Sequence, residues 1–552
     1  MVRKTSLALA ALIGIAVVSL TTAPRIAAQD AWPTADSWTN AAGDAANWIL
    51  PARSYSGNRY VKTTQITPRN VGTLKKMWSA SIDARGPLET SPIVWNGVMY
   101  VTSSHNDVYA LDAATGAQKW HFHDNPHVIA FSANRGVALA NGKVYEATLD
   151  GHLIALDATT GKPVWNVVAA HDTTNTFYTM QPVPYKNMLL LGASNGDWGG
   201  IGYISAFDQA TGKRLWDWYT VPGPGQPGHS SWSGDSWKRG GGAIWSGVAI
   251  DPATNMLYVD AGNPQPDFLG TIRKGANLYT NSTIALDISG AKPKMKWYHQ
   301  YIPHDTHDWD PAMPPVLFTG TVGGASRKLV AAGDKGGNFW VLDAGTGALV
   351  YHVAVSTQKG QNTEPSRTGN IACPNTNGGV EFNGASYLKE TNAFYIPSVD
   401  QCGRWKSPGT ATYIAGQFYL GGSFPTLVGP STGYMQALDI GTGKFLWRKH
   451  LAFPQIGGAL SMSSGVVFSG GVNGDFAAYD AKTGNVLWHW ASGMAIQAPA
   501  MTYEAGGKQY VAVAVGPAGV NFADPRMGQG APTLEGRYTH PTHAAITAFA
   551  LP

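Results

Sequence analysis

The sequence predicts an all-β protein, an eight-bladed β-propeller built from four-stranded antiparallel blades. Three observations lead to it: one short phrase returns six times, its spacing matches the length of one blade, and helical periodicity is hard to find after residue 28. The chain has 552 residues with 66 glycines and 11% aromatic residues, so it can bury a large core. This composition excludes collagen, a coiled coil and a charged disordered chain.

The repeated phrase runs from alternating apolar residues into Asp, then Thr-Gly, then a large aromatic residue. Full copies end at Trp120, Trp165, Trp216, Tyr351, Trp447 and Trp488, a degenerate copy ends at Trp297, and a half copy ends at Trp78. Asp caps a turn through its side-chain oxygens and Gly accepts a positive φ, so each copy predicts a hairpin. We expect the repeated aromatic residue to dock one blade on the next.

The spacing of the repeated aspartates sets the number of blades. Asp112 and Asp157 are 45 positions apart, and Asp439 and Asp480 are 41 apart, as in repeats with one four-stranded blade of ~40 to 50 residues. The intervals of 79 before Asp287 and 96 before Asp439 leave room for insertions or an unmarked blade. Seven or eight blades fit, and we predict eight. A linear β-solenoid has much shorter coils.

The first residues predict the compartment. Arg3 and Lys4 precede an apolar run from Leu7 to Leu20, and small residues end at Ala28. This pattern predicts a secretory signal peptide over residues 1–28, followed by one propeller domain over 29–552. The run is shorter than the ~20 residues of a spanning helix, and no later stretch is long enough. We therefore predict a periplasmic protein without a membrane span.

Charge and cysteine content exclude several classes of partner. The signal segment holds three basic residues and no acidic one, so its removal lowers the formal net charge from +4 to +1. The chain has no Lys/Arg-rich run, which argues against binding of nucleic acid. It has no CxxCH motif for a covalent c-type haem. Cys373 and Cys402 either pair in an oxidising compartment or remain free buried thiols.

Three segments depart from the repeat and are rich in polar side chains. The first, from Pro303 to Asp310, reads PHDTHDWD. It is either a solvated loop with capping aspartates or a metal site, and because Asp dominates, the metal would be a hard cation such as calcium. Asp197 lies among glycines, and Asn263 ends an apolar strand. Each alone is an ordinary turn residue, but together they favour a site.

The order of these phrases resembles the periplasmic quinoprotein alcohol dehydrogenases, which use pyrroloquinoline quinone (PQQ). The matching phrases cover nearly the whole mature chain, in the order GPLETSP, NRG, GDWGGIGYISAFD, GGGAIW, GNP, PHDTHDWD and GDKGGNFWVLD. The resemblance implies PQQ-dependent oxidation of an alcohol to the aldehyde or ketone. Electrons would pass to a separate soluble cytochrome c.

The resemblance also implies roles for individual residues. Asp308 matches the general base, which also contacts the metal, and Lys335 stands near the quinone oxygens. Asp197, Asn263 and Asp310 match metal ligands, and Asp310 resembles the mark of lanthanide-using members. We predict calcium, with a lanthanide as the alternative. The implied cofactor-binding residues are Glu89, Arg135, Thr179, Ser194, Trp245 and Lys335, and the implied disulfide joins Cys373 to Cys402.

Two departures from the family and one rival function accompany this reading. Ile129 and Ala130 stand where the family commonly has adjacent cysteines, and Asp197 replaces a longer Glu. The rival is a non-catalytic PQQ-repeat propeller that serves as an envelope scaffold or binding protein.

The loops Gln265–Tyr279 and Pro408–Tyr434 are expected to form pocket walls. The sequence leaves open which alcohol is oxidised and whether the chain forms a homodimer.

Overall fold

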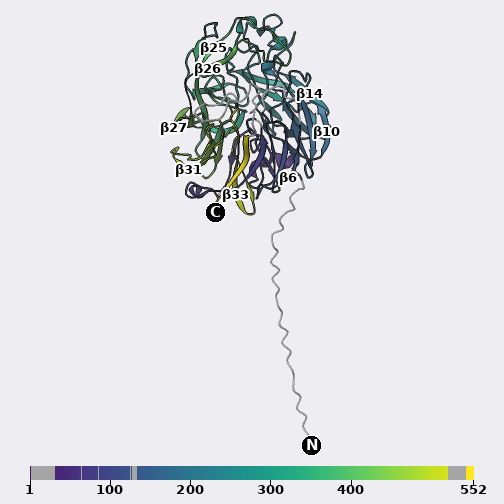
Figure 1. Ribbon diagram of the computed structural model, residues 1–552, viewed down its shortest axis with the longest axis vertical. Helices are drawn as coiled ribbons and strands as arrows, with labels where there is room; N and C mark the ends of the chain where they lie inside the picture. The colour runs from purple at the N-terminus through teal and green to yellow at the C-terminus, as the bar shows by residue number, and fades with distance from the viewer. Residues whose placement is uncertain (2–31, 64, 85, 125, 127–132, 520–541) are drawn as a thin grey trace. The chain divides into compact units, whose positions relative to one another are not determined.

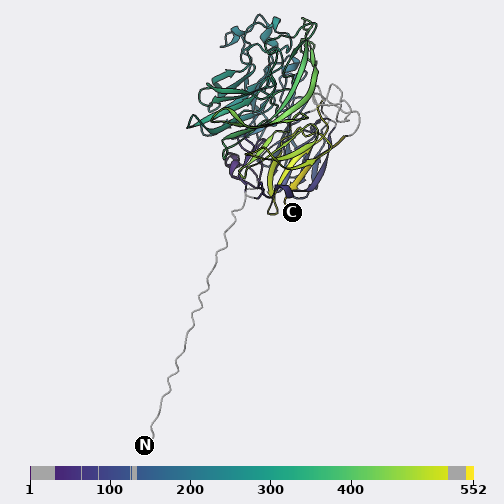
Figure 2. The same cartoon turned by 90° about the vertical axis from the view of Figure 1, so that its left-hand side faces the viewer.

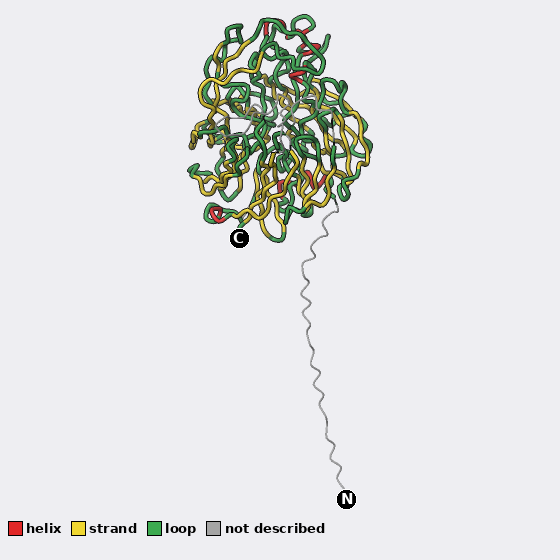
Figure 3. The backbone as a smooth tube through the Cα atoms, viewed as in Figure 1, coloured by secondary structure: helices red, strands yellow, loops and turns green. Residues whose placement is uncertain are grey.

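Strands dominate the chain in the computed structural model (Figure 3), which describes residues 1, 32–63, 65–84, 86–124, 126, 133–519 and 542–552. Residues 2–28 of the expected signal peptide lie outside this part, as do Ile129 and Ala130. The helices of the described residues are short: α1 (Ala35–Thr39), η1 (Ala41–Gly43), η2 (Val71–Thr73), η3 (Gly196–Trp198), η4 (His229–Ser231), η5 (Ser236–Arg239) and η6 (Gly270–Ile272). None is long and apolar enough to cross a membrane.

Eight antiparallel sheets form the blades, and the first four follow one another along the chain. Blade 1 contains β3 (Ile93–Trp95), β4 (Val98–Thr102), β5 (Val108–Asp112) and β6 (Gln118–Phe122). Blade 2 contains β7 (Ala138–Ala140), β8 (Lys143–Ala147), β9 (His152–Asp157) and β10 (Pro163–Val168). Blade 3 contains β11 (Val183–Tyr185), β12 (Met188–Gly192), β13 (Tyr203–Asp208) and β14 (Arg214–Tyr219). Blade 4 contains β15 (Val248–Asp251), β16 (Met256–Ala261), β17 (Ser282–Asp287) and β18 (Lys294–Gln300).

The remaining blades include two with an added strand. Blade 5 contains β19 (Val316–Val322), β20 (Ala325–Gly333), β21 (Asn338–Asp343) and β22 (Leu349–Ala354). Blade 6 contains β24 (Ser386–Leu388), β25 (Ala393–Lys406), β26 (Ser423–Asp439) and β27 (Lys444–Leu451), with β23 (Asn370–Ala372) added on β25. Blade 7 contains β28 (Ala459–Met462), β29 (Val466–Gly470), β30 (Asp475–Asp480) and β31 (Val486–Ala491), with β1 (Tyr60–Val61) added in parallel on β28. Blade 8 contains β32 (Met501–Ala505), β33 (Lys508–Val515), β34 (Thr542–Ala550) and β2 (Lys75–Ala84).

The blades follow one another around a centre, and blade 8 joins the two ends of the described propeller. The labels β6, β10, β14, β25, β27, β31 and β33 run in this order around Figure 1. The N-terminal strand β2 pairs with the C-terminal strand β34, and the purple and yellow ribbons lie side by side in Figure 2. The predicted eight-bladed propeller of four-stranded blades is therefore confirmed.

The repeated phrase forms the turn between the third and fourth strands, as expected. In blade 1, Asp112 Oδ1 accepts hydrogen bonds from the backbone N–H groups of Ala114 and Thr115, each at 3.1 Å, and from the Thr115 hydroxyl at 3.0 Å. Gly116 completes the turn with φ +74°. This positive φ is accessible to glycine without strain.

The repeated Trp docks on the next blade. Trp120 Nε1 of blade 1 donates to the carbonyl oxygen of Ala158 in blade 2 at 3.0 Å, and the Tyr100 hydroxyl donates to the same oxygen at 3.2 Å. A Cβ added to Gly161 of that turn would lie 2.6 Å from the Trp120 ring, so glycine also makes room for the indole. Equivalent Trp and Tyr pairs donate to one carbonyl at Ala113 (Trp78, Tyr503), Ala344 (Trp297, Tyr258) and Ala481 (Trp447, Tyr395).

The two long intervals of the repeat contain insertions. The interval before Asp439 holds β25 and β26, of 14 and 17 residues, which extend blade 6 as a long hairpin. The interval before Asp287 holds the loops with η4, η5 and η6. Two blades lack a full copy of the phrase: blade 4 holds the degenerate copy that ends at Trp297, and blade 8 takes its strands from both ends of the chain.

Strand direction separates two ends of the propeller. Successive strands of a blade are antiparallel, so the Asp-x-x-Thr-Gly turns all lie at one end, which we call the turn end. The opposite end carries the loops between second and third strands and the connections from one blade to the next. We call it the loop end. All predicted cofactor and metal residues lie in segments of the loop end.

Candidate active site at the loop end

A cavity of about 1050 Å³, including the solvent at its mouth, opens among the loops of the loop end. Its lining contains every cofactor and metal residue that the sequence predicted: Glu89, Arg135, Thr179, Ser194, Asp197, Trp245, Asn263, Asp308, Asp310 and Lys335. These residues come from connections in blades 1 to 5 and are far apart in sequence. The propeller thus brings the whole predicted set into one cavity.

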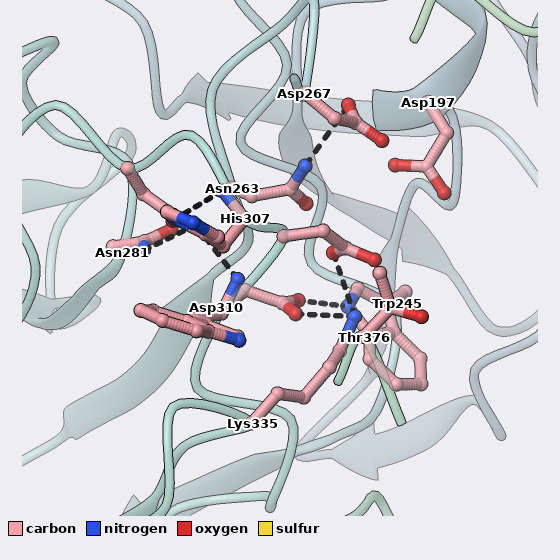
Figure 4. A network of polar contacts seen from close by, with 12 residues as sticks. Asp197, Trp245, Asn263, Asp267, Asn281, His307, Asp310, Lys335 and Thr376 are labelled. Carbon is pink, nitrogen blue, oxygen red and sulfur yellow. Dashed lines mark hydrogen bonds and ion pairs between the residues drawn. The ribbon is translucent and has the colours of Figure 1, made fainter. Parts of the chain in front are cut away.

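Lys335 lies between two of the predicted carboxylates. Its Nζ is 2.7 Å from Asp308 Oδ1 and 2.6 Å from Asp310 Oδ1 (Figure 4). Lys335 follows β20, whereas both aspartates precede β19. Asp308 adopts φ +57°, the left-handed region that is uncommon for residues other than glycine. The backbone at Asp308 therefore holds this carboxylate in a position that an ordinary extended loop would not provide.

Trp245 presents its ring to the cavity between two cationic groups. Its Nε1 donates to Asp310 Oδ2 at 2.8 Å, which fixes the indole. Arg135 Cζ lies 4.9 Å from the centre of this ring, and Lys335 Nζ lies 5.6 Å from it. Arg135 Cζ is also 4.2 Å from the centre of the Phe382 ring. The site therefore combines a flat aromatic surface with two cationic groups that lie over the ring.

A second group of oxygens lies across the cavity from Lys335, around Asn263. Asn263 Nδ2 donates to Asp267 Oδ1 at 3.1 Å, and Gln265 Nε2 donates to Asp197 Oδ1 at 3.3 Å and to Asp267 Oδ1. Asp267 is 1% exposed, and its Oδ2 has no hydrogen-bond partner among the described residues. Figure 4 shows Asp267 and Asp197 next to each other above Asp310 and Lys335.

Enclosure of these acids changes their pKa values. Burial raises the pKa of Asp197 to about 6, although Lys335 opposes this shift. Burial also raises the pKa of Asp308 and of Asp267 well above the ordinary value, and the neighbouring carboxylates add to it. For Lys335, burial disfavours the ammonium, but Asp308 and Asp310 raise its pKa well above the usual range. The cavity holds more acidic groups than its positive charge can balance.

The remaining predicted residues line the other side of the cavity. The Thr179 and Ser194 hydroxyls are 2.9 Å apart, and Thr179 Oγ1 donates to the Trp245 carbonyl oxygen at 3.2 Å. Glu89 Oε2 is 2.8 Å from Arg135 Nη2, so these two side chains form a buried ion pair. Burial raises the pKa of Glu89, and Arg135 opposes the shift.

The segment Pro303–Asp310 divides into structural and cavity-facing residues. Asp305 accepts hydrogen bonds from the backbone N–H groups of His307 and Trp309, at 2.8 and 2.7 Å, so it caps the loop. The His307 ring stacks on Trp309 with centroids 4.2 Å apart. Only Asp308 and Asp310 of this segment line the cavity. Asp305 is thus a capping aspartate, but the expected solvated loop is wrong because residues 305–310 are buried, and the metal site stays a prediction.

The predicted disulfide is formed. Cys373 and Cys402 are bonded, with Cα atoms 4.3 Å apart, which excludes the alternative of free thiols. The bridge joins the end of β23 to β25, and the segment after Cys373 supplies Thr376 and Asn377 to the cavity wall. Pro374 accepts a hydrogen bond from Trp309 Nε1 at 3.2 Å. The disulfide therefore supports the wall beside Asp308.

Several functional candidates were missed by sequence reasoning. Asp267 and Gln265 lie in the expected wall segment Gln265–Tyr279, none of whose residues lines the cavity, and no motif singled them out. Glu381 and Phe382 lie in an unmarked loop of blade 6, and burial raises the pKa of Glu381 to about 7. Phe424 of the second expected wall segment does line the cavity. The position of Asp267, four residues after the asparagine of GNP, could have identified it, because a short loop keeps the two residues close together.

Comparison with known proteins agrees with this geometry. A family model for the β-propeller domain of glucose, ethanol and alcohol dehydrogenases matches residues 48–361 and 407–511. The dehydrogenase subunit of the quinone alcohol dehydrogenase of Gluconobacter oxydans is 32% identical, over 89% of this chain and 73% of that protein. The lanthanide-dependent methanol dehydrogenase of Methylacidiphilum fumariolicum is 32% identical, over 86% of this chain and 85% of that protein.

Solved structures give the same result. A europium-containing methanol dehydrogenase is 30% identical with a TM-score of 0.83, over 94% of this chain and 100% of that chain. The quinohemoprotein alcohol dehydrogenase ADHIIG of Pseudomonas putida is 28% identical with a TM-score of 0.84, over 94% of this chain and 82% of that chain. These relatives are dehydrogenases, which contradicts the alternative of a non-catalytic scaffold. The chain therefore belongs to the PQQ-dependent alcohol dehydrogenase family, as an oxidoreductase with the family's β-propeller domain.

Proposed function

We propose that the protein oxidises a small alcohol to the aldehyde or ketone, with PQQ and a metal cation in the loop-end cavity and Asp308 as the general base. The observation that carries this proposal is the group of enclosed carboxylates beside one lysine and the ring of Trp245. This combination provides a cation site, an aromatic support and a base within one cavity.

The donor set fits a hard cation. Every candidate ligand offers oxygen, from Asp197, Asn263, Asp308 and Asp310, and such ligands suit calcium or a lanthanide better than zinc. Lys335 is the cation that contacts two of these carboxylates, at 2.7 and 2.6 Å. Enclosing several carboxylates is costly unless positive charge compensates them. A multivalent cation supplies that charge. The buried Asp267 Oδ2 has no hydrogen-bond donor among the described residues, so such an ion could take the place of a donor.

The other half of the cavity fits PQQ, a flat molecule with several carboxylates. Trp245 offers an aromatic face, and stacking on it adds to the energy of burial. Arg135 and Lys335 lie over this ring, 4.9 and 5.6 Å from its centre, and can pair with carboxylates or quinone oxygens. Thr179 and Ser194 supply hydroxyl donors. We assign Glu89 to the edge of the cofactor through its ion pair with Arg135.

The residues then divide the chemistry between them. When bound, PQQ would supply the electron-accepting quinone, and the cation held by Asp197, Asn263, Asp308 and Asp310 would act as a Lewis acid. Asp308 takes the proton of the alcohol hydroxyl, because a carboxylate with a raised pKa is, when ionised, a stronger base than an ordinary carboxylate. Lys335 holds Asp308 and Asp310 in place and stabilises negative charge that develops near its ammonium. Trp245 orients the cofactor face and is itself fixed by Asp310.

The charge of the site bears on the choice of cation. Asp310 and Asp267 add carboxylates to the set formed by Asp197, Asn263 and Asp308, and more anionic oxygens suit a trivalent ion. Asp197 is shorter than the family's Glu. Gln265 Nε2 donates hydrogen bonds to both Asp197 and Asp267 and so links the two carboxylates. We propose that Asp267 provides the reach that Asp197 loses. This favours a lanthanide over the calcium expected from the sequence.

The remaining parts of the proposal concern partners and location. The chain contains no CxxCH motif, so we propose that electrons leave to a separate soluble cytochrome c, whereas some relatives are quinohemoproteins by name. We also propose export to the periplasm through residues 1–28, with residues 29–552 as one propeller domain.

Calorimetric titration tests the proposal. The purified protein is titrated with PQQ in calcium, in lanthanum and in chelator, and the same samples are assayed for dye-linked alcohol oxidation. We expect binding and turnover that require a metal, with lanthanum more effective than calcium. Absence of PQQ binding by folded protein in every metal condition would overturn the proposal. Higher activity with calcium would overturn only the choice of cation.

A further inference from the structure

A separate cluster of metal-ligating side chains lies at the loop end of blade 1. Asp107 directly precedes β5, His121 lies in β6 and His123 follows it. Strand register pairs Tyr109 with His121 and Val108 with Phe122. Side chains alternate between the faces of a sheet, so Asp107 opposes His123 on the face that also carries Tyr109 and His121. None of the three ligating residues lines the cofactor cavity.

The ligating atoms are close together. His123 Nδ1 is 2.8 Å from Asp107 Oδ1, and His121 Nε2 is 3.6 Å from Asp107 Oδ2. One ligating atom from each residue lies within 4.8 Å of the other two. Zinc binds nitrogen and oxygen ligands at ~2.0 to 2.2 Å, so two ligands of one tetrahedral ion are ~3 to 3.5 Å apart. Small side-chain rotations would bring the three atoms to that separation.

The neighbouring residues hold this arrangement. The Tyr109 ring stacks on the His121 ring, with centroids 4.2 Å apart and an interplanar angle of 7°. The Asp107 backbone N–H donates to Ser103 Oγ at 3.1 Å. The side chains of Asp107, His121 and His123 are 5%, 30% and 70% exposed. The carboxylate is thus fixed in the blade, while the imidazoles remain open to an ion and its water ligands.

The local charge favours a cation. Glu146 of β8 is buried near this cluster, and its pKa is raised well above the ordinary value by burial and by the carboxylates of Asp124, Asp107 and Asp150. Three aspartates therefore lie close enough to Glu146 to raise its pKa. A positive ion between Asp107 and the two histidines reduces their repulsion.

We propose that Asp107, His121 and His123 form a second metal site, which binds a divalent transition-metal ion of the zinc class. Two imidazole nitrogens and one carboxylate oxygen are typical ligands for such ions, and three protein ligands leave a position for water. The proposed metal site of the cavity has oxygen ligands only, so the two sites differ in ligand type. The two sites are therefore expected to select different ions.

Zinc titration of the full chain tests this proposal. The protein is loaded with PQQ and excess calcium, so that the cavity site is filled, and is then titrated with zinc by calorimetry. We expect one further binding event near one ion per chain. His121→Ala and His123→Ala should each weaken it at least ~10-fold, and the double variant should abolish it. The same event is expected without PQQ, so failure of the proposed dehydrogenase function would not affect this result.

A matched control is available in blade 3. His171 Nε2 is 3.0 Å from Asp217 Oδ2, and among the described residues no second histidine brings a ligating atom within 4.8 Å of both. His171→Ala should leave zinc binding unchanged. Copper(II) bound to the wild type should show nitrogen hyperfine coupling in its paramagnetic resonance spectrum, and the double variant should lose it. Equal zinc binding by wild type and double variant, or none by the folded wild type, would overturn the proposal.

Discussion

Aspartates at the two ends of the propeller have pKa values that are shifted in opposite directions. At the turn end, Asp157 Oδ1 accepts hydrogen bonds from the N–H groups of Thr159 and Thr160, at 3.1 and 2.8 Å, and from the Thr160 hydroxyl at 2.8 Å. The Thr160 hydroxyl lowers the pKa of this exposed carboxyl group. At the loop end, burial raises the pKa values of Asp267 and Asp308 well above the ordinary value.

This difference separates stability from function. Turn-end aspartates are satisfied by residues two or three positions away, so each copy of the phrase is complete in itself. Loop-end acids are packed beside other acids, which opposes folding in the absence of a cation. Unfavourable local arrangements of this kind are expected where a ligand or a reaction requires them. Three substitutions compare the two ends, from the largest expected effect to the smallest.

Asp308→Asn should remove the base at the loop end. We expect the rate of alcohol oxidation to fall ~10²- to 10⁴-fold, because the amide cannot take the hydroxyl proton. The side chain keeps its size, so the fold should remain. Steady-state kinetics with a dye acceptor, together with circular dichroism, measure both.

The matched control is Asp157→Asn at the turn end. It should lower thermal stability slightly and leave turnover per folded molecule unchanged. If Asp308→Asn retains activity while folded, or if Asp157→Asn reduces turnover as strongly, the division between the two ends is wrong.

Asp267→Asn should weaken cation binding. We expect the affinity for terbium, a luminescent lanthanide probe, to fall ~10- to 100-fold, the loss typical of a group that supports a metal ligand. Asp267 accepts a hydrogen bond from Asn263 and adds negative charge beside Asp197. Turnover should recover at saturating metal. Asp172→Asn, an exposed aspartate outside the cavity, is the control, and unchanged terbium affinity in Asp267→Asn would remove this residue from the cation site.

Gly161→Ala should destabilise the turn end without affecting chemistry. Gly161 and Gly97 have φ of +72° and +74°, but a methyl group at Gly161 would meet Trp120, whereas Gly97 has no atom within 4 Å of that position. Strain should cost both variants ~1 to 2 kcal/mol, and overlap with the indole should cost Gly161→Ala ~1 to 3 kcal/mol more. Chemical denaturation measures the difference, and equal stability of the two variants would show that Trp120 docking contributes little.

Much of the candidate site could be predicted because short phrases keep their residues in recognisable surroundings. Asp308, Lys335, Trp245 and Asn263 were identified in this way, and all four line the cavity. Asp267 was not, because its place four residues after Asn263 puts it near the site but does not tell whether the acid faces Asp197 or solvent. The pair His121 and His123 was overlooked for a similar reason, since Asp107 becomes their neighbour only through strand pairing.

The sequence by itself determined the blades, their turns and their docking residues. Those properties depend on alternation, on Asp-x-x-Thr-Gly chemistry and on a repeat length, all of which act over a few residues to a few tens of residues. Only the tertiary structure decided which polar groups meet: that Asp305 caps a loop while Asp308 faces Lys335, and that the predicted residues of five blades line one cavity. Such meetings depend on strand register and on the arrangement of blades around their centre. Neither is encoded in any one segment of the chain.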